Sequence, residues 1–229
     1  MIPARMGSTR VPKKNIRYLG DKPLINYPIE LALKSGLFDD IYINTESEEL
    51  GRYAKSLGVL FYKRPEILSS NTATNREFMY DFLKNVECDY VIMLNPTSPL
   101  VSQNSLNDFY ELISGGEYDT VMTVVSEKTE CFYKEKPVNF DLSVKINSQL
   151  LEPVHRVVWA MTGWKRSTFI HNQENGINPI FGGKIGLYNI RKDESCDIDT
   201  EQDWNEAEGG ILRKETAPKY LNLDDYKNN

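Results

Sequence analysis

Cations and small residues gather near the beginning of this sequence, in the segment 3–15 (PARMGSTRVPKKN). Small residues let a backbone approach a ligand and present its amide N–H groups, while neighbouring cations neutralise negative charge. Such a loop suits a triphosphate, although it matches neither the Walker A pattern GxxxxGK(S/T) nor GxGxxG. A solvated basic turn is the alternative interpretation. The small residues are Ala4, Gly7 and Ser8, and the cations are Arg5, Arg10, Lys13 and Lys14.

Two carboxylates, Asp197 and Asp199, flank one apolar residue, Ile198, late in the chain. In an extended segment their side chains point the same way, while Ile198 points into the core. Two such carboxylates can bind Mg²⁺, a hard cation that takes one or two carboxylates together with phosphate oxygens of a substrate. Helix capping is the alternative, since Asp199 followed by Gln202 fits the start of a capping box. The two interpretations are compatible.

Two polar segments complete the set of candidates. In residues 94–100 (LNPTSPL), two prolines stiffen a loop that presents the amide of Asn95 and the hydroxyls of Thr97 and Ser98. This loop follows an apolar strand, at the position where α/β proteins bind ligands. The other segment combines Arg64 with residues 69–75 (SSNTATN). In isolation it is more simply interpreted as the beginning of a helix.

The overall charge and the histidine count exclude several classes of function. The net charge is −6, and no run of Lys and Arg is longer than two residues. Binding to nucleic acid or to a membrane surface needs a concentrated basic face, so neither is expected. His155 and His171 are the two histidines, and no Ser lies in a GxSxG motif. A His-centred triad and a His-rich metal site are therefore disfavoured.

Cysteine usage indicates a reducing compartment. Cys88, Cys131 and Cys196 are far apart and form no CxxC pair, so neither a disulfide framework nor a zinc knuckle is expected. No apolar run approaches the ~20 residues of a membrane span, and the first residues contain no apolar core of a signal peptide. A cytoplasmic location follows.

The elements that must position these residues alternate between strand and helix. Such alternation predicts an α/β fold: a mostly parallel sheet with helices on both faces, whose strands end along one edge. A helix is expected within 23–36, closed by Gly36, and another within 47–58, with Ser47 as its N-cap. The other predicted helices are 75–87, 104–114 and 200–214, and the predicted strands are 39–45, 59–64, 89–95, 119–125 and 184–190.

Two regions depart from this alternation. Residues 1–5 look like the last part of a strand entering a loop, so the first strand would be only two or three residues long; whether it begins further upstream stays open. Residues 126–180 contain scattered aromatics, Pro and Asn, with only short alternating runs such as Leu142–Ile146. We interpret 1–229 as a single domain in which 126–180 is an inserted excursion of short strands and loops that packs against another surface, such as that of a second subunit.

In their order and intervals, the four polar segments resemble those of the acylneuraminate cytidylyltransferase family, which activates eight- and nine-carbon acid sugars. Residues 2–15 match each fixed position of IPARxxSxxxPxKN. Residues 64–73 resemble RPxxLxxDxA, residues 94–101 (LNPTSPLV) resemble LQPTSPLR, and residues 197–203 match DIDTExD. The resemblance covers residues 2–125 and 184–210. It implies a Rossmann-like fold of the nucleotide-diphospho-sugar transferase type, with a protruding dimerisation element that corresponds to 126–180.

The resemblance also implies a function and a role for each motif residue. The expected reaction transfers CMP from CTP to an acidic sugar, sialic-acid-like or a related 2-keto-3-deoxy sugar, with Mg²⁺ as cofactor, pyrophosphate as product and a homodimer as the assembly. Arg5, Lys14 and Asp199 would be catalytic, and Asp197 and Asp199 would bind the metal. The nucleotide would lie against Ala4, Arg5, Gly7, Ser8, Thr9, Arg10, Lys14, Asn15, Arg64 and Ala73, and the acceptor would face Asn95, Pro96, Thr97 and Ser98.

The departures from the family pattern concentrate on the acceptor side. Asn71 replaces an Asp, Asn95 a Gln and Val101 an Arg, and Ser8-Thr9-Arg10 looks like the enzymes for eight-carbon sugars. Where sialate enzymes have RPNGAIY, this chain has residues 182–188 (GGKIGLY), so Lys184, Arg156 and Arg166 are the candidates for meeting the acceptor's acid group. A different acceptor, either a sugar phosphate or a phosphonate-like acid, is one alternative. A nucleotide-binding homologue without turnover is another.

Overall fold

The computed structural model of the chain describes residues 1–212, so residues 213 and 214 of the predicted last helix lie outside the described residues. The strands are β1 (Ile2–Pro3), β2 (Tyr18–Leu19), β3 (Lys22–Pro23), β4 (Tyr42–Thr45), β5 (Leu60–Lys63), β6 (Tyr90–Leu94), β7 (Thr120–Glu127), β8 (Phe132–Tyr133), β9 (Lys136–Pro137), β10 (Val154–Lys165) and β11 (Ile185–Asn189). The helices are α1 (Asn26–Ser35), α2 (Glu48–Ser56), α3 (Asn75–Asn85), α4 (Gln103–Ser114), α5 (Arg166–Glu174) and α6 (Glu201–Leu212).

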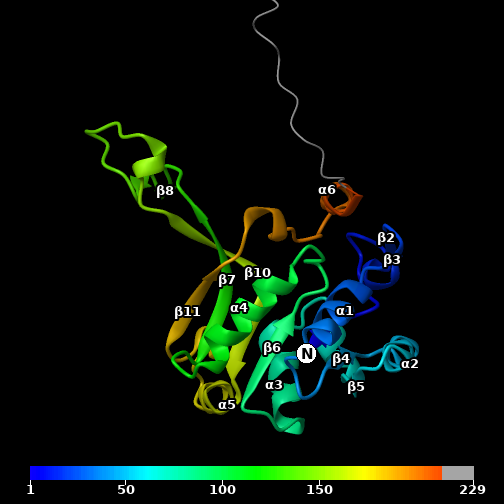
Figure 1. Ribbon diagram of the computed structural model, residues 1–229. Coiled ribbons are helices and arrows are strands. Elements are labelled where there is room, and N and C mark those ends of the chain that lie inside the picture. The colour runs from blue at the N-terminus through cyan, green and yellow to red at the C-terminus, as the bar shows by residue number, and fades with distance from the viewer. Residues whose placement is uncertain (213–229) are drawn as a thin grey trace, which may run out of the picture.

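Seven strands form one twisted sheet in the order β5-β4-β1-β6-β10-β7-β11 (Figure 1). The two halves join where Met1 N donates to the Ile92 carbonyl (2.8 Å) and Leu94 N donates to the Met1 carbonyl (3.1 Å), the pattern of a parallel pair. β10 runs antiparallel to both β6 and β7, and the other paired strands of this sheet are parallel. The predicted α/β fold with a mostly parallel sheet is confirmed, and β1 is as short as expected.

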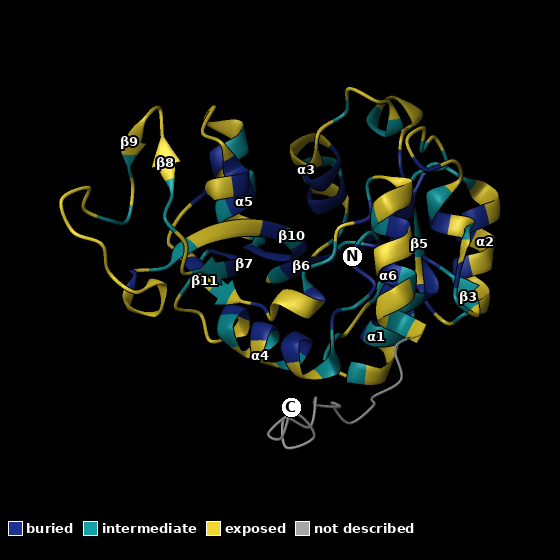
Figure 2. Ribbon diagram, turned by 90° about the horizontal axis from the view of Figure 1, so that it is seen from above, coloured by how far each residue is buried: buried dark blue, intermediate teal, exposed yellow. Residues whose placement is uncertain are grey.

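Apolar residues bury both faces of the sheet under helices. One cluster joins the sheet to α1, α2 and α4, through buried side chains such as Ile29, Leu50 and Phe109. A second cluster joins the other face to α3 and α5, through residues such as Phe82 and Phe169. In Figure 2, α3 and α5 lie on one side of the sheet, and α1 and α4 lie on the opposite side. The two-sided arrangement leaves the edge where the parallel strands end open to loops.

A third apolar cluster lies at that edge and holds together segments from both ends of the chain. Val11 and Leu24 pack with Ile198 and with Trp204 of α6, and each of these side chains is at most 2% exposed. Burial of such side chains stabilises the arrangement by roughly 1.5–3 kcal/mol each. The cluster therefore fixes the first loop beside residues 197–199.

The helix starts agree with the sequence in part. Ser47 Oγ accepts a hydrogen bond from Leu50 N, as predicted, and Gly36 ends α1 with a φ of 63°. The predicted capping by Asp199 and Gln202 is wrong. The cap of α6 is formed by Thr200 and Asp203: the Asp203 carboxylate accepts from the backbone amides of Asp199 (2.9 Å) and Thr200 (2.7 Å).

The excursion predicted for 126–180 is much narrower in the structure. Val154–Lys165 forms β10, an inner strand of the sheet, and Arg166–Glu174 forms α5. The sequence pattern hid β10 because its register against β7 shifts between Val157 and Thr162, which disrupts the alternation of apolar and polar residues. Residues 128–153, which include β8 and β9, project from the body as an arm (Figure 1). The alternating run Leu142–Ile146 forms no strand.

Within residues 1–212, no helix combines the length and the apolar composition that crossing a membrane would require.

Candidate active site

The first loop runs from β1 to a short 3-10 helix at Lys14–Ile16 and is closed by a buried amide. The Asn15 side chain, 7% exposed, donates from Nδ2 to the Arg5 carbonyl at 2.9 Å. The Asn15 carbonyl accepts from Ile25 N at 3.0 Å, which ties the loop to the beginning of α1. On the far side of the loop, Met6 N donates to Glu46 Oε1 at 2.7 Å. The loop is therefore held at both ends while its tip stays free.

The tip of this loop carries the small and hydroxyl residues that suit a phosphate. Gly7 and Thr9 are exposed and Ser8 is half-buried. A Cβ placed on Gly7 would meet no atom within 4 Å, so the protein leaves open space at this backbone position. Backbone amides exposed in this way can donate to an anionic ligand.

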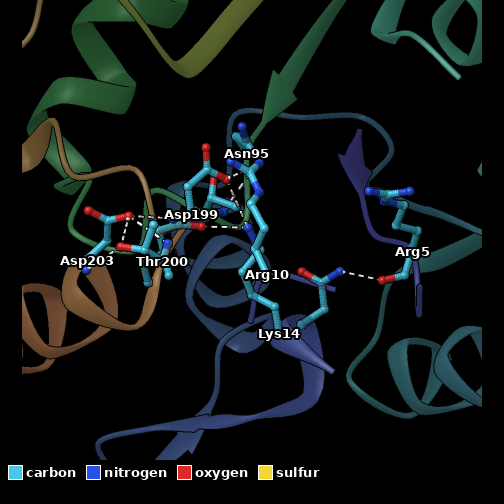
Figure 3. Close-up of polar contacts among 10 residues, drawn as sticks. Arg5, Arg10, Lys14, Asn95, Asp199, Thr200 and Asp203 are labelled. Carbon is cyan, nitrogen blue, oxygen red and sulfur yellow. Dashed lines mark hydrogen bonds and ion pairs between the residues drawn. The ribbon is translucent and has the colours of Figure 1, made fainter. Parts of the chain in front are cut away.

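Cations of the first loop reach the late acidic pair, as Figure 3 shows. Lys14 Nζ lies 2.5 Å from the Ile198 carbonyl oxygen and 3.5 Å from Asp199 Oδ1. Arg10 Nη2 donates to the same Asp199 oxygen at 2.8 Å. Ile198 is fully buried whereas Asp197 is exposed and Asp199 half-buried, so the predicted alternation around Ile198 is confirmed.

Burial and charge shift the ionisation of this group. Burial lowers the pKa of Lys14, and the nearby carboxylates of Asp199 and Asp197 partly oppose that shift. Desolvation by the surrounding protein raises the pKa of Asp197, although solvent reaches the residue. Asp199 forms ion pairs with Arg10 and Lys14, whereas Asp197 forms no ion pair with any residue in 1–212.

The two carboxylates fit a metal that arrives with most of its own ligands. Within residues 1–212, no group of three or more His, Cys, Asp or Glu side chains is arranged to hold a metal ion. Mg²⁺ usually keeps several waters and binds through one or two carboxylates plus substrate phosphates. Asp197 and Asp199 supply hard oxygen ligands of this kind, next to a loop that suits phosphates.

Arg5 points away from the acidic pair (Figure 3), and its hydrogen bonds go to the second polar segment. Its Nη1 donates to the Ser70 carbonyl at 3.0 Å and to Asn71 Oδ1 at 2.8 Å. The amide of Ala73 is held by Ser70 Oγ at 3.2 Å. Arg5 therefore links the first loop to the second.

Arg64 lies beneath these loops, not at their surface. It is 3% exposed, its Nε donates to Asn44 Oδ1 at 2.7 Å, and its guanidinium lies 4.2 Å from the ring centre of Phe78. Desolvation lowers the pKa of Arg64 to about 10. Sequence reasoning missed its neighbours Asn44 and Glu46, whose only signal was their position at the end of a predicted strand. Glu46 Oε2 is buried and has no hydrogen-bond partner among the described residues.

The third loop lies against the acidic pair through its backbone. The Thr97 carbonyl accepts from Ile198 N at 2.9 Å, and Asn95 N donates to the Ala160 carbonyl of β10 at 3.0 Å. Asn95 Oδ1 accepts from Thr97 N at 3.4 Å, and Ser98 is 6% exposed. The structure thus brings the first loop, the third loop and residues 197–199 together at the edge of the sheet where the parallel strands end.

Lys184 lies outside this cluster of loops, and the expectation that it meets the acceptor near Asn95 is wrong for this chain. Lys184 directly precedes β11. The strand registers place the next residue, Ile185, at the same height in the sheet as Val91, near the beginning of β6. Asn95 lies four residues further along, ~13 Å at about 3.3 Å per residue. Lys184 instead pairs with Glu117 at 2.8 Å.

The two arginines named as alternatives to Lys184 lie at opposite edges. Arg166 is at the end of β10, bonded to the Leu83 carbonyl (2.9 Å) and to Glu87, and so shares the edge of Lys184. Arg156 is in register with Val125 near the end of β7, and it pairs with Glu127 at 3.4 Å. Of the three cations, Arg156 is the one on the side of the site.

Comparison with known proteins finds one family across the whole chain. A family model described as Cytidylyltransferase matches residues 1–228. N-acylneuraminate cytidylyltransferase A of Danio rerio is 29% identical over 217 residues, which cover 93% of this chain and 50% of that protein. Post-translational flagellin modification protein B of Campylobacter coli is 30% identical over 231 residues, 95% of this chain and 96% of that protein. The chain spans about half the length of the first of these relatives.

Solved structures agree on the fold. The structure of a CMP:2-keto-3-deoxy-manno-octonic acid synthetase complexed with CTP superimposes with a TM-score of 0.68 at 13% identity. The match covers 92% of this chain and 96% of that one. At this level of identity the likeness concerns the fold alone.

Proposed function

This chain belongs to the cytidylyltransferase family, and from that premise we propose that it transfers CMP from CTP to an acidic sugar and releases pyrophosphate. The observation that carries the proposal is the contact of Lys14 with Asp199, at 3.5 Å. It unites a loop suited to phosphates with a carboxylate pair suited to a divalent cation. The names of the relatives, which include N-acylneuraminate cytidylyltransferases, support an acidic sugar as acceptor.

The first loop would bind the triphosphate. Backbone amides around Gly7 and Ser8 would donate to phosphate oxygens, and Arg10 and Lys14 would neutralise their charge. Arg10, with 69% of its side chain exposed, is free to move from Asp199 to a phosphate. Lys14, with 13% exposed, is held in place and would meet the phosphates without rearrangement.

Asp197 and Asp199 would hold the divalent cation, proposed as Mg²⁺. When bound, the metal would neutralise phosphate charge and orient the triphosphate. The two carboxylates would fix its position relative to the loop, since Ile198 between them is fully buried. Asp199 would then exchange part of its contact with Arg10 for the metal.

The reaction would be an in-line displacement. A hydroxyl oxygen of the acceptor would form a bond to the α-phosphorus of CTP and give up its proton to water, while the bond to the bridging oxygen breaks and pyrophosphate leaves. Asn95 and Thr97, on a loop fixed to β10 and to Ile198, would orient the acceptor. Arg5, which points away from Asp199 and toward the second loop, and Ala73 of that loop would lie beside the nucleoside. The buried side chains of Asn15 and Arg64 would hold these loops in position beneath it. The protein's contribution is positioning and charge stabilisation.

We extend the proposal to the assembly and the location. The arm at 128–153 exposes large apolar side chains, and such patches commonly mark protein interfaces, which supports a homodimer. These side chains include Phe132 (59% exposed), Leu142 (70%) and Val144 (54%). Cys88, Cys131 and Cys196 are free thiols, which supports the cytoplasm.

Pyrophosphate release with a panel of nucleotides and acceptors tests the proposal. CTP, UTP, GTP and ATP would each be paired with N-acetylneuraminate, 2-keto-3-deoxy-manno-octonate and a sugar phosphate. The proposal predicts release with CTP and a sugar acid, dependent on Mg²⁺. Release only with a sugar phosphate would instead identify a different acceptor class. CTP binding without release on any acceptor would indicate a homologue without turnover.

A further inference from the structure

A groove of about 820 Å³ opens between α3 and α5 and is not assigned to any step above. Its walls are the first turn of α3 with Arg76, residue Trp159 of β10, Gln173 of α5 and the segment that contains Phe181. Grooves of roughly 300–1,000 Å³ are of the size that binds small molecules.

Two of its wall residues adjoin the proposed site along the chain. Trp159 directly precedes Ala160, whose carbonyl accepts the hydrogen bond from Asn95 N at 3.0 Å. Thr74, another wall residue, directly follows Ala73 of the second loop. The second loop therefore leads into one wall of the groove, and β10, to which the acceptor loop is bonded, contributes another.

Its aromatic side chains offer a partly exposed surface. The rings of Trp159 and Phe181 lie 6.0 Å apart, with an interplanar angle of 58°. Phe181 is 49% exposed, whereas Trp164 and Trp204 are 1% and 2% exposed. The negative face of an aromatic ring attracts the partly positive C–H groups of a sugar ring, and nearby amides such as Gln173 can bond its hydroxyls.

Arg76 gives the groove a positive charge. Its Nε donates to Gln173 Oε1 at 2.5 Å, which orients the guanidinium. Arg76 forms no ion pair with any residue in 1–212, although the whole chain has a net charge of −6. Neighbouring Glu77 is engaged in the capping box of α3, where Thr74 N donates to its carboxylate at 2.7 Å. An oriented guanidinium of this kind binds a carboxylate or a phosphate group through paired hydrogen bonds.

We infer that this groove binds the acceptor as an anionic sugar, with its ring against Trp159 and Phe181 and its negative group on Arg76. The inference rests on the proposed function, and it replaces Lys184 with Arg76 as the cation that selects an acid. Both a carboxylate and a phosphate group can accept the paired hydrogen bonds of a guanidinium. The sugars used as probes below distinguish the two.

The test is a titration that needs no turnover. Trp159 is the half-buried tryptophan at the groove, so its fluorescence reports binding, and Trp159→Phe identifies the signal. The probes are N-acetylneuraminate, 2-keto-3-deoxy-manno-octonate, glucose 6-phosphate and uncharged N-acetylmannosamine. We expect saturable binding of a carboxylate sugar or of the phosphate sugar, and much weaker binding of the neutral one. Arg76→Ala should weaken binding of the anionic sugar roughly 10- to 100-fold.

Matched variants keep the result specific. Arg76→Lys keeps the charge but loses the paired hydrogen bonds, so it should restore only part of the affinity. Lys84→Ala removes one positive charge from the other end of α3 and should change nothing. In turnover, Arg76→Ala should raise KM for the acceptor and leave CTP affinity unchanged.

Two outcomes would overturn the inference: wild-type protein that binds no anionic sugar, or Arg76→Ala that binds and uses it as the wild type does. Failure of the proposed function looks different. In that case CTP is not bound, or no pyrophosphate is released, whatever the groove titration shows.

Discussion

Lys14 Nζ lies 3.5 Å from the carboxylate of Asp199, although 185 positions separate the two residues in the chain. The contact exists because Ile198 is buried with Val11 and Leu24, which brings residues 197–199 against the first loop. A cation and a carboxylate in contact with each other would bind a polyphosphate side by side, the cation directly and the carboxylate through a divalent ion. Several measurements follow from this arrangement.

Lys14→Met should weaken CTP binding roughly 10- to 100-fold, since it removes a charge-assisted contact from a side chain that is already in place. Methionine keeps most of the volume, so the fold should persist. Isothermal titration with CTP measures the effect. Lys34→Met is the matched control, because Lys34 lies in the last turn of α1, outside the loop, with 73% of its side chain exposed. Equal affinities of wild type and Lys14→Met would contradict the role of Lys14.

Asn15→Ala should loosen the first loop as well as the fold. The variant leaves the Arg5 carbonyl without its 2.9 Å hydrogen bond from a buried amide, which should cost about 1–3 kcal/mol of unfolding free energy. CTP binding should weaken too, because the loop loses its closure. Urea unfolding and CTP titration measure both effects. Asn104→Ala, at an exposed position of α4, serves as control. Unchanged stability would show that the buried bond is dispensable.

Tyr62 makes stability depend on alkaline pH. Burial, together with the hydrogen bond from its hydroxyl to Asp81 (2.8 Å), raises the pKa of Tyr62 to about 12 from an ordinary value of 10.0. The folded state therefore keeps the proton longer than the unfolded chain does. Its contribution to stability is complete below pH 10 and is lost as pH rises toward 12. The stability advantage of wild type over Tyr62→Phe should shrink across that interval.

Urea unfolding of both proteins below pH 10 and between pH 10 and 12 measures this change. Tyr18→Phe controls for the loss of a tyrosine, since Tyr18 is 64% exposed. A constant difference between wild type and Tyr62→Phe across the interval would refute the assignment.

The arm gives a prediction about the assembly. Leu142→Asp combined with Val144→Asp places two charges on its exposed apolar surface and should convert a dimer into a monomer. Light scattering coupled to size exclusion measures the mass. Ile67→Asp, at another apolar residue that is 79% exposed, should leave the dimer intact. A monomeric wild type, or a dimer that survives the double substitution, would contradict the proposal that the arm forms the dimer interface.

Local patterns and motif order predicted much of the fold and of the site. Parallel strands end at one edge, so the loops that follow 1–5, 59–64 and 89–95 had to meet there, and the apolar Ile198 between two aspartates indicated which way they face. The partner of Arg5, Asn71, could not be predicted, because a long side chain's direction depends on tertiary contacts. β10 was missed because a register shift breaks its periodicity. Lys184 was misplaced because the resemblance to a family motif assigned it to the acceptor, whereas the first residue of the predicted strand 184–190 belongs at the edge opposite the end of 89–95.

The most direct test of the account is the CTP affinity of Asp199→Ala, measured with a chelator and then with saturating Mg²⁺. Without the metal, the account predicts that Asp199→Ala binds CTP more tightly than wild type, because a negative charge next to the triphosphate is gone and Arg10 and Lys14 are released. With Mg²⁺ the order should reverse, since the metal loses a ligand. Asp193→Ala, an exposed carboxylate nearby, should show neither change. An effect of the same sign in both conditions, or no effect, would contradict a site in which Asp199 faces both the phosphates and the metal.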